Sequence, residues 1–515
     1  MTAAIERVRG LGARLDVTDM PLWATASALA GLTALSLYLR TRVLGAGFWI
    51  DEGLSVGIAH HPFTAIPHLL RQDGSPPLYY LLLHVWIGWF GDSERATHSL
   101  SLIFALACIP LAYWVGRSVF GPVSGWICAG LAAVDPYLTY YAQETRMYSL
   151  VAMLSFVAAG SYVHGVLNGE RRYLPVLGVS LVLIIYTHNW GLFLAVGYGV
   201  ATLVFARDKL KEAAIAAGIA LLLYLPWLPT LLFQSKHTAA PWAMVPSFHA
   251  LLLAPGAVLS GDAPFTAIVL AGGVGLAAIV RRRSDPARRP VLSLATVVGA
   301  TVLVAWLGSQ ISPAWTTRYF GVVLGPLLMI SAAGLARAGR LGIVALVAVC
   351  IIWTNYVQQD NKENARAIMA SVAADVHPGD LVLSTHPEQV PVLRYYLGPG
   401  YRWATTLGPV ADSQVMDWRD ALTRIRRVTP AAELEPVLAS VRPGQHLVVV
   451  SPVFRDYRAW ESRWTREVYL TSQVWTRDIA RDPRFRQVAY VGTNEILDKL
   501  NYFKPLQAAV YVRKG

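Results

Sequence analysis

Charged residues are scarce in this sequence, and the shortage excludes a protein that is water-soluble throughout. Asp, Glu, Lys and Arg make up 15% of the 515 residues, against about 25% in an ordinary soluble domain. The shortage is uneven, because 39 of these charged residues fall in residues 1–360 and 37 in the much shorter stretch 361–515. We therefore predict a membrane domain over residues 1–360 and a water-soluble domain over residues 361–515.

Cysteine is almost absent. Its three occurrences, Cys108, Cys128 and Cys350, all lie in apolar runs. This pattern excludes a disulfide framework and a thiolate metal site. A cleavable signal peptide is not evident either, because the first apolar run continues from Pro21 to Leu39 without a convincing cleavage site. We interpret that run as the first membrane-spanning helix.

Long apolar runs dominate the first 360 residues. A spanning helix needs about 20 apolar residues, and about eleven runs are plausible spans: 22–42, 97–116, 122–140, 148–167, 172–187, 190–206, 212–232, 264–280, 290–309, 319–336 and 340–357. The apolar run 76–90 is short and rich in Tyr and Trp, so we interpret it as a juxtamembrane helix in a long external loop over residues 43–96.

Basic residues set the orientation of this polytopic α-helical protein. If the N-terminus, with Arg7, Arg9 and Arg14, is cytoplasmic, the basic loops at 117, 171–172, 207–211, 281–289 and 337–340 are cytoplasmic too. Arg40 and Arg42 are the exception. This distribution explains the formal net charge of +12 without a nucleic-acid partner. An odd number of spans places the C-terminal domain outside.

Polar residues gather at helix ends on the predicted external side. They include Asp51, Glu52, Asp73, Glu144, Arg146, His188, Lys236, Arg318 and Tyr319. Ionisable groups are costly in lipid unless they pair or line water. The pattern predicts a shared external cavity with an active site, although ion pairs between helix ends would give a similar pattern.

Five of these motifs carry a resemblance to a known family. Trp49-Ile50-Asp51-Glu52-Gly53, Asp73-Gly74-Ser75-Pro76-Pro77, Tyr141 to Tyr148, Tyr186-Thr187-His188 and Arg318-Tyr319-Phe320 occur in the order seen in bacterial family 39 glycosyltransferases. These are GT-C fold enzymes, similar to protein O-mannosyltransferases and to aminoarabinose transferases that modify lipid A. The resemblance covers roughly residues 20–357. One motif departs from it: relatives often carry a basic residue before the two prolines, where this chain has Ser75.

The resemblance implies sugar transfer, with inversion, from a polyprenyl-phosphate sugar in the bilayer to a hydroxyl of a cell-envelope glycan, lipid or protein. The acceptor must lose a proton and the leaving phosphate gathers negative charge, so a carboxylate and fixed cations are needed. Asp51 matches the family's catalytic aspartate and is the predicted base, and Glu52 is expected to orient the acceptor, the loop or a cation. A helix-end acidic cluster is the structural alternative for this pair.

Arginine is the better clamp for phosphate, because its guanidinium donates paired hydrogen bonds and stays charged. Arg146 and Arg318 are therefore the first candidates for the donor phosphate, with interface anchoring as the alternative. His188 and Lys236 are further candidates, although His188 can equally be an interfacial histidine and Lys236 a solvated loop lysine. Asp73, Glu144 and Tyr319 are the expected substrate contacts, and Asp73 can equally be a turn former before Gly74.

A metal is an open question at this stage. Asp51, Glu52 and Asp73 offer oxygen ligands suited to Mg²⁺ or Mn²⁺, and no His or Cys spacing favours zinc. A lipid-linked sugar transporter or flippase is the alternative function, but such proteins usually place polar sites near the membrane midplane.

The C-terminal domain has an α/β pattern. Strand-like segments occur at 380–384, 445–450, 487–491 and 508–512, and helix-like segments at 388–397, 418–428 and 460–476. No motif of a nucleophile or phosphate loop stands out, so its expected part in acceptor recognition or shielding rests on position alone.

Overall fold

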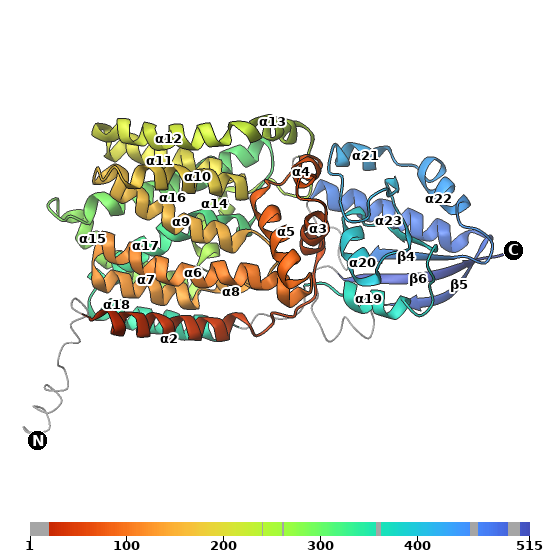
Figure 1. Ribbon diagram of the computed structural model, residues 1–515, viewed down its shortest axis with the longest axis horizontal. Coiled ribbons are helices and arrows are strands. Elements are labelled where there is room, and N and C mark those ends of the chain that lie inside the picture. Colours follow the sequence, from red (N-terminus) through yellow and green to blue (C-terminus); the bar gives the residue numbers. More distant parts are fainter. Residues whose placement is uncertain (1–19, 239, 260–261, 357–361, 454–461, 493–504) are drawn as a thin grey trace, which may run out of the picture.

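A bundle of long helices and a domain built on a mixed sheet lie end to end in the computed structural model (Figure 1). It describes residues 20–238, 240–259, 262–356, 362–453, 462–492 and 505–515. Arg7, Arg9 and Arg14, used above for orientation, lie outside the described residues, as does the boundary predicted at residue 360.

Seven helical segments of the described chain are long and apolar enough to cross a membrane. They contain α2 (Leu22–Arg40), α6 (Glu94–Phe120), α9 (Tyr148–Tyr162), α12 (Leu210–Tyr224) with α13 (Leu228–His237), α15 (Asp262–Arg281), α16 (Arg288–Ile311) and α17 (Gly321–Arg337). Four shorter apolar helices complete the bundle: α7 (Pro122–Val134), α10 (Tyr173–Thr187), α11 (Gly191–Phe205) and α18 (Arg340–Thr354). Each of the eleven expected spans coincides with one of these segments, and the number that cross the membrane stays a prediction.

Arg40 was an exception to the charge pattern, and its surroundings explain why. Its side chain is fully buried and donates to the carbonyl oxygens of Ala105 (2.7 Å) and Ala132 (2.6 Å), on α6 and α7. Arg40 therefore joins three helices inside the bundle, so it carries no information about loop orientation.

Three short helices lie at one end of the bundle, between it and the sheet domain (Figure 1). They are α3 (Ile50–Ala59), α4 (Ile66–Asp73) and α5 (Leu78–Phe90), and α5 packs against α3, α6 and α10. This matches the predicted loop 43–96 with its juxtamembrane helix. Two further short helices were not predicted, α8 (Pro136–Tyr141) and α14 (Phe248–Val258).

The C-terminal domain contains a six-stranded sheet of order β3-β2-β1-β4-β6-β5. The four predicted strands are β1 (Leu381–Ser384), β4 (His446–Pro452), β5 (Phe485–Val491) and β6 (Leu506–Arg513), and the unpredicted ones are β2 (Arg402–Thr405) and β3 (Gly408–Pro409). β1 runs parallel to β2 and β4, whereas β6 is antiparallel to β4 and β5. The missed strands have four and two residues.

Helices cover this sheet. The three predicted ones appear as α20 (Val390–Leu397), α21 (Ala421–Arg427) and α23 (Arg463–Arg481), while α19 (Ala365–Val372) and α22 (Glu435–Ala439) were not predicted. Trp460, the predicted start of the third helix, lies outside the described residues.

The sheet domain packs directly onto α3. A side-chain carbon added to Gly53 would lie 2.5 Å from Cβ of Val392 on α20, so glycine is required for this approach. The Tyr396 hydroxyl accepts from the backbone N–H of Phe48 (2.7 Å), and Phe48 is buried in the same apolar cluster as Val392 and Val448. Residues 43–96, called the external segment after their predicted location, therefore form one continuous core with the C-terminal domain.

Candidate functional site

A cavity of about 350 Å³ lies where the bundle, the external segment and the C-terminal domain meet. Six of the nine predicted site residues line it: Asp51, Asp73, Arg146, His188, Arg318 and Tyr319. They come from α3, α4, the turn before α9, the end of α10 and the 3₁₀ turn Thr317–Phe320. Trp418 of the C-terminal domain also lines the cavity, so both domains contribute to its wall.

Asp51 and two arginines form the charged centre of this cavity. Asp51 Oδ2 lies 2.6 Å from Nη1 of Arg318 and 4.0 Å from Nη2 of Arg146. All three side chains are largely buried, with 20%, 15% and 11% of their surface exposed for Asp51, Arg318 and Arg146. The sequence motifs therefore converge, and the helix-end ion pair that was the alternative explanation is present within the cavity itself.

Arg146 is held by short polar side chains. Its Nη1 donates to Ser55 Oγ (2.9 Å), to Tyr80 OH (3.2 Å) and to the backbone oxygen of Asp51 (3.3 Å). Ser55 lies one helical turn after Asp51 and donates to the same backbone oxygen (2.8 Å). The guanidinium therefore has a set orientation beside the carboxylate.

Arg318 is framed by aromatic rings. Its guanidinium carbon lies 4.8 Å from the ring centroid of Trp242 and 5.4 Å from that of Trp49, distances at which a cation is attracted to a ring face. The Tyr137 hydroxyl donates to the backbone oxygen of Arg318 (2.6 Å). The Nε atoms of Arg318 and Arg146 are buried and have no hydrogen-bond partner among the described residues.

His188 lines the same cavity as the two arginines and is a neutral ring. Its Nδ1 accepts from the backbone N–H of Trp190 (3.1 Å), which leaves the proton on Nε2. Burial, together with the charges of Arg146 and Arg318, lowers the pKa of His188 to about 3. The Tyr319 ring packs against it, with centroids 4.3 Å apart. His188 can therefore give a phosphate or a sugar a hydrogen bond, but no positive charge.

Asp73 is the last residue of α4 and faces the cavity just before Gly74, whose φ of 99° is the left-handed conformation that ends the helix. Burial raises the pKa of Asp73. Gln234 of α13 fixes this turn by donating to the backbone oxygens of Leu70 (2.8 Å) and Ser75 (3.2 Å). Asp73 thus ends a helix and also lines the cavity, and its contact with a substrate stays a prediction.

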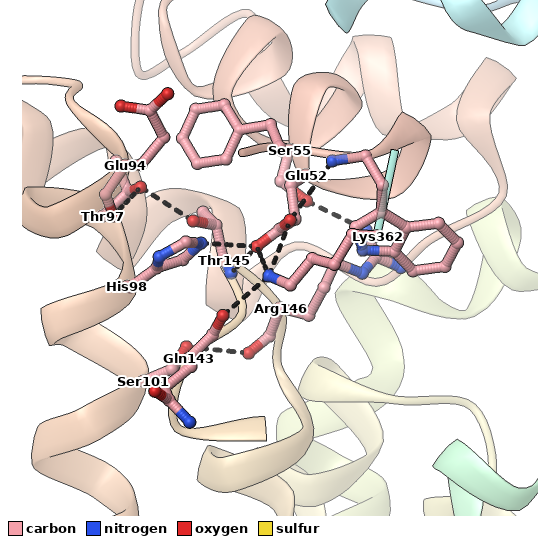
Figure 2. Close-up of polar contacts among 12 residues, drawn as sticks. Glu52, Ser55, Glu94, Thr97, His98, Ser101, Gln143, Thr145, Arg146 and Lys362 are labelled. Atoms are coloured by element: carbon pink, nitrogen blue, oxygen red, sulfur yellow. Dashed lines mark hydrogen bonds and ion pairs between the residues drawn. The ribbon is translucent and has the colours of Figure 1, made fainter. Parts of the chain in front are cut away.

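Glu52 points away from the cavity into a buried network (Figure 2). Its Oε1 lies 2.7 Å from Nε2 of His98 and accepts from the backbone N–H of Thr145 (2.8 Å). Nζ of Lys362, from the start of the C-terminal domain, lies 3.0 Å from both carboxylate oxygens. Burial opposes ionisation, but Lys362 and His98 outweigh it and hold the pKa of Glu52 below its usual range. Of the three predicted roles, the structure favours orientation of the loop.

Besides Glu52, two predicted residues lie outside the cavity lining. Glu144 is 1% exposed, and burial raises its pKa to about 8, although Lys362 opposes this shift. Its placement does not support the predicted substrate contact. Lys236 is exposed in the last turn of α13 rather than in a loop, and it lines a neighbouring cavity with His237 and Arg463. Its exposure is that of the solvated lysine considered as the alternative, and its contact with a donor phosphate stays a prediction.

The oxygen ligands considered for Mg²⁺ or Mn²⁺ do not come together. Glu52 is engaged by Lys362 and His98, and Asp51 by Arg318. Within the described ranges, the group of three side chains with suitable metal-ligand spacing is His377, Asp380 and His446, at the starts of β1 and β4. Two oxygens of Asp380 already accept backbone N–H groups there. The donor set of the central cavity therefore fits an anion better than a metal ion.

Several functional side chains were not singled out from sequence. Tyr80 and Ser55 belong to motifs around the predicted residues, so helical spacing from Asp51 could have suggested Ser55. Trp242, Trp418 and Lys362 lie far from every motif in the chain and carried no signal. The packing of the two domains brings Trp418 and Lys362 to the site, whereas Trp242 belongs to the first domain.

Comparison with known proteins supports the fold. Neither a protein-family model nor a curated protein matches the chain. Among solved structures, ArnT from Cupriavidus metallidurans bound to undecaprenyl phosphate has a TM-score of 0.57 and 15% identity, covering 85% of this chain and 95% of ArnT.

Two other solved structures are similar. One is the archaeal oligosaccharyltransferase AglB from Archaeoglobus fulgidus, in complex with an inhibitory peptide and a dolichol-phosphate. It has a TM-score of 0.53 and 12% sequence identity, and the match covers 83% of this chain and 69% of AglB. The arabinofuranosyltransferase AftD from Mycobacteria has a TM-score of 0.55 and 16% sequence identity, and the match covers 97% of this chain and 42% of AftD. At these identities the likeness establishes the fold, and the predicted GT-C fold with a C-terminal sheet domain is confirmed.

Proposed function

We propose that this protein, a multi-pass protein of the bacterial cytoplasmic membrane, is an inverting glycosyltransferase. It moves a sugar from a polyprenyl-phosphate sugar to a hydroxyl of a cell-envelope glycan, lipid or protein at the outer face of that membrane. The observation that carries the proposal is Asp51, a cavity-lining carboxylate held 2.6 Å from Arg318 and 4.0 Å from Arg146. One cavity thus holds a base for the acceptor and two cations for the leaving phosphate.

The proposed reaction exchanges one carbon–oxygen bond for another and moves one proton. The acceptor oxygen attacks the anomeric carbon from the face opposite the phosphate, its proton passes to the Asp51 carboxylate, and the carbon–oxygen bond to the lipid phosphate breaks. Because the leaving phosphate gains negative charge, fixed guanidinium groups stabilise the transition state more than the ground state. Arg318 and Arg146, which both line the cavity, supply this charge.

The arginine pair can also compensate for Ser75, which stands where relatives often have a basic residue. In a chain without a basic residue before Pro76-Pro77, the phosphate needs other cations. Arg146 approaches this segment directly, because its Nη1 donates to Tyr80 on α5, which begins just after the two prolines. We infer that Arg146 takes the place of the missing basic residue, with His188 as a neutral hydrogen-bond donor.

The fold and the position of the cavity also support a lipid-linked donor and an outward-facing site. The fold is shared with ArnT, which was solved with undecaprenyl phosphate, and with AglB, which was solved with a dolichol-phosphate. The cavity lies at the end of the bundle where the C-terminal domain packs. With the basic loops in the cytoplasm, this end faces outward. A donor with its tail in the bilayer and its sugar in the cavity fits this placement.

The test compares cells with and without the gene by mass spectrometry of their envelope glycans, lipids and proteins. The lost sugar names the donor, and purified protein in liposomes is then given that polyprenyl-phosphate sugar and the acceptor fraction of the deletion strain. Transfer by the wild-type protein supports the proposal. Movement of the donor across the liposome membrane without any transfer contradicts it and favours the flippase alternative.

A further inference from the structure

The strongest feature outside the catalytic centre is the buried network of Figure 2, which joins the C-terminal domain to the residues next to Asp51 and Arg146. We propose that Lys362 is a positioning residue, through which the C-terminal domain fixes the geometry of the Asp51 carboxylate and the Arg146 guanidinium. This inference rests on the proposed function and gives the C-terminal domain a catalytic part.

Lys362 uses its full hydrogen-bonding capacity in this network. An ammonium group has three donors, and Nζ lies 3.0 Å from Oε1 of Glu52, 3.0 Å from its Oε2 and 2.7 Å from the backbone oxygen of Gln143. Lys362 is 5% exposed and Glu52 is fully buried. Separating a buried ion pair would leave two charges without compensation by water, which is strongly destabilising. The contact therefore constrains both the segment of Glu52 and the segment of Gln143 strongly.

One of the constrained segments carries the proposed base. Glu52 directly follows Asp51 in the first turn of α3, and its Oε2 accepts from the backbone N–H of Trp49 (3.3 Å), which caps the helix. The start of α3, and with it the direction in which Asp51 leaves the helix, therefore depends on where the Glu52 carboxylate is held. Asp51 must reach Arg318 and the acceptor at once, so a shift of a fraction of an ångström matters.

The other constrained segment carries a proposed phosphate ligand. Gln143 accepts from Lys362 through its backbone oxygen, and Thr145 donates its backbone N–H to the same Glu52 carboxylate (2.8 Å). The next residue is Arg146. Lys362 and Glu52 together therefore hold the turn that carries Arg146 against the helix that carries Asp51.

Lys362 is itself anchored on the sheet. Two residues later, the Asn364 side chain donates to the backbone oxygen of Leu506 (2.9 Å) and accepts from its backbone N–H (2.7 Å), at the start of β6. Glu363 accepts from the Gln389 side chain (2.5 Å). The position of Nζ is thus set by the C-terminal domain rather than by the membrane helices.

The experiment uses full-length protein in liposomes with the polyprenyl-phosphate sugar identified above. We expect Lys362→Met to lower turnover at saturating donor at least about tenfold, while the half-saturating donor concentration changes less than about twofold, because orientation rather than binding is lost. Lys362→Arg, which keeps the charge, should recover part of that loss. The melting temperature of each variant separates this effect from unfolding.

Two further variants keep the test decisive. Glu52→Gln keeps the shape but removes the ion pair, so it serves if Lys362→Met does not fold, and it too should lower turnover without altering the half-saturating donor concentration. Arg366→Met removes a different contact between the domains, the pair of Arg366 with Glu94 (2.7 Å), and should keep turnover within about twofold of wild type.

The outcomes are separable. Wild-type turnover in folded Lys362→Met or Glu52→Gln protein overturns the positioning role, as does a loss that only follows the unfolded fraction. If the wild-type protein transfers no sugar, the proposed function fails instead.

Discussion

Replacing Asp51 by asparagine separates the proposed base from the proposed phosphate site. Asparagine keeps the shape of the side chain and an oxygen that can accept from Arg318, but it cannot take the acceptor proton. A positioned base contributes about 10²–10⁴ in rate, which corresponds to about 2.7–5.4 kcal/mol in the barrier. We therefore expect turnover to fall by that factor in Asp51→Asn.

The same substitution should spare donor binding or strengthen it. Asp51 is an anion whose Oδ2 lies 2.6 Å from Arg318 and 4.0 Å from Arg146, so it competes with a phosphate for both guanidinium groups. Removing a like charge from a partly buried site favours the incoming anion by about 1 kcal/mol or more. Binding of undecaprenyl phosphate, followed by calorimetry or tryptophan fluorescence, should tighten about fivefold or stay unchanged.

Asp92→Asn is the matched control. Asp92 belongs to the same external segment, pairs with His60 (3.1 Å) and has 48% of its side chain exposed. It should transfer sugar at the wild-type rate. The assignment of Asp51 as base is refuted if Asp51→Asn keeps wild-type turnover in the liposome assay. It is refuted equally if that variant loses donor binding in proportion to its loss of turnover.

The remaining predictions test the clamp, the buried acid and the domain contact. Arg318→Lys keeps a charge but loses the paired donors, so we expect turnover to fall about tenfold or more in the transfer assay; equal turnover would show that charge alone suffices. Burial raises the pKa of Glu144 from about 4.5 to about 8, so the folded protein holds this proton more tightly than the unfolded chain does. The resulting contribution to stability is complete below about pH 4.5 and is lost as the pH rises through about 8. Glu144→Gln should therefore melt with less pH dependence than wild type between pH 5 and 9, and an unchanged profile would contradict the assignment. A methyl group on Gly57 would overlap the backbone oxygen of Gln414, so Gly57→Ala should cost about 1–3 kcal/mol of stability in a denaturation experiment, whereas a change at open Gly88 should not.

The contact of Lys362 with Glu52 suggests that the C-terminal domain does more than cover the cavity. Its helix α20 packs against α3 through Val392 and Tyr396, and Trp418 reaches the cavity wall. A soluble domain that only shielded the site would need neither a buried ion pair with Glu52 nor a shared core. The domain and the external segment are therefore best regarded as one unit that holds the catalytic residues.

The sequence by itself determined the layout of this protein. Apolar run lengths and basic loops are local properties, so they indicated the helices of the bundle, the juxtamembrane position of α5 and the sheet domain. Because helix ends on one side of a bundle must meet, they also indicated that Asp51, Arg146 and Arg318 share a cavity. The exception at Arg40 could not be explained from the sequence, since hydropathy cannot tell a loop arginine from one buried against carbonyl oxygens.

Only the tertiary structure decided which groups the two carboxylates of the acidic pair meet. Asp51 and Glu52 are adjacent and chemically alike, yet the helical turn between them directs one carboxylate to the cavity and the other to Lys362. Lys362 is 310 residues away in the chain, and no local pattern records such a contact. The tertiary structure also removed Glu144 and Lys236 from the cavity, because burial and facing depend on the packing of the two domains.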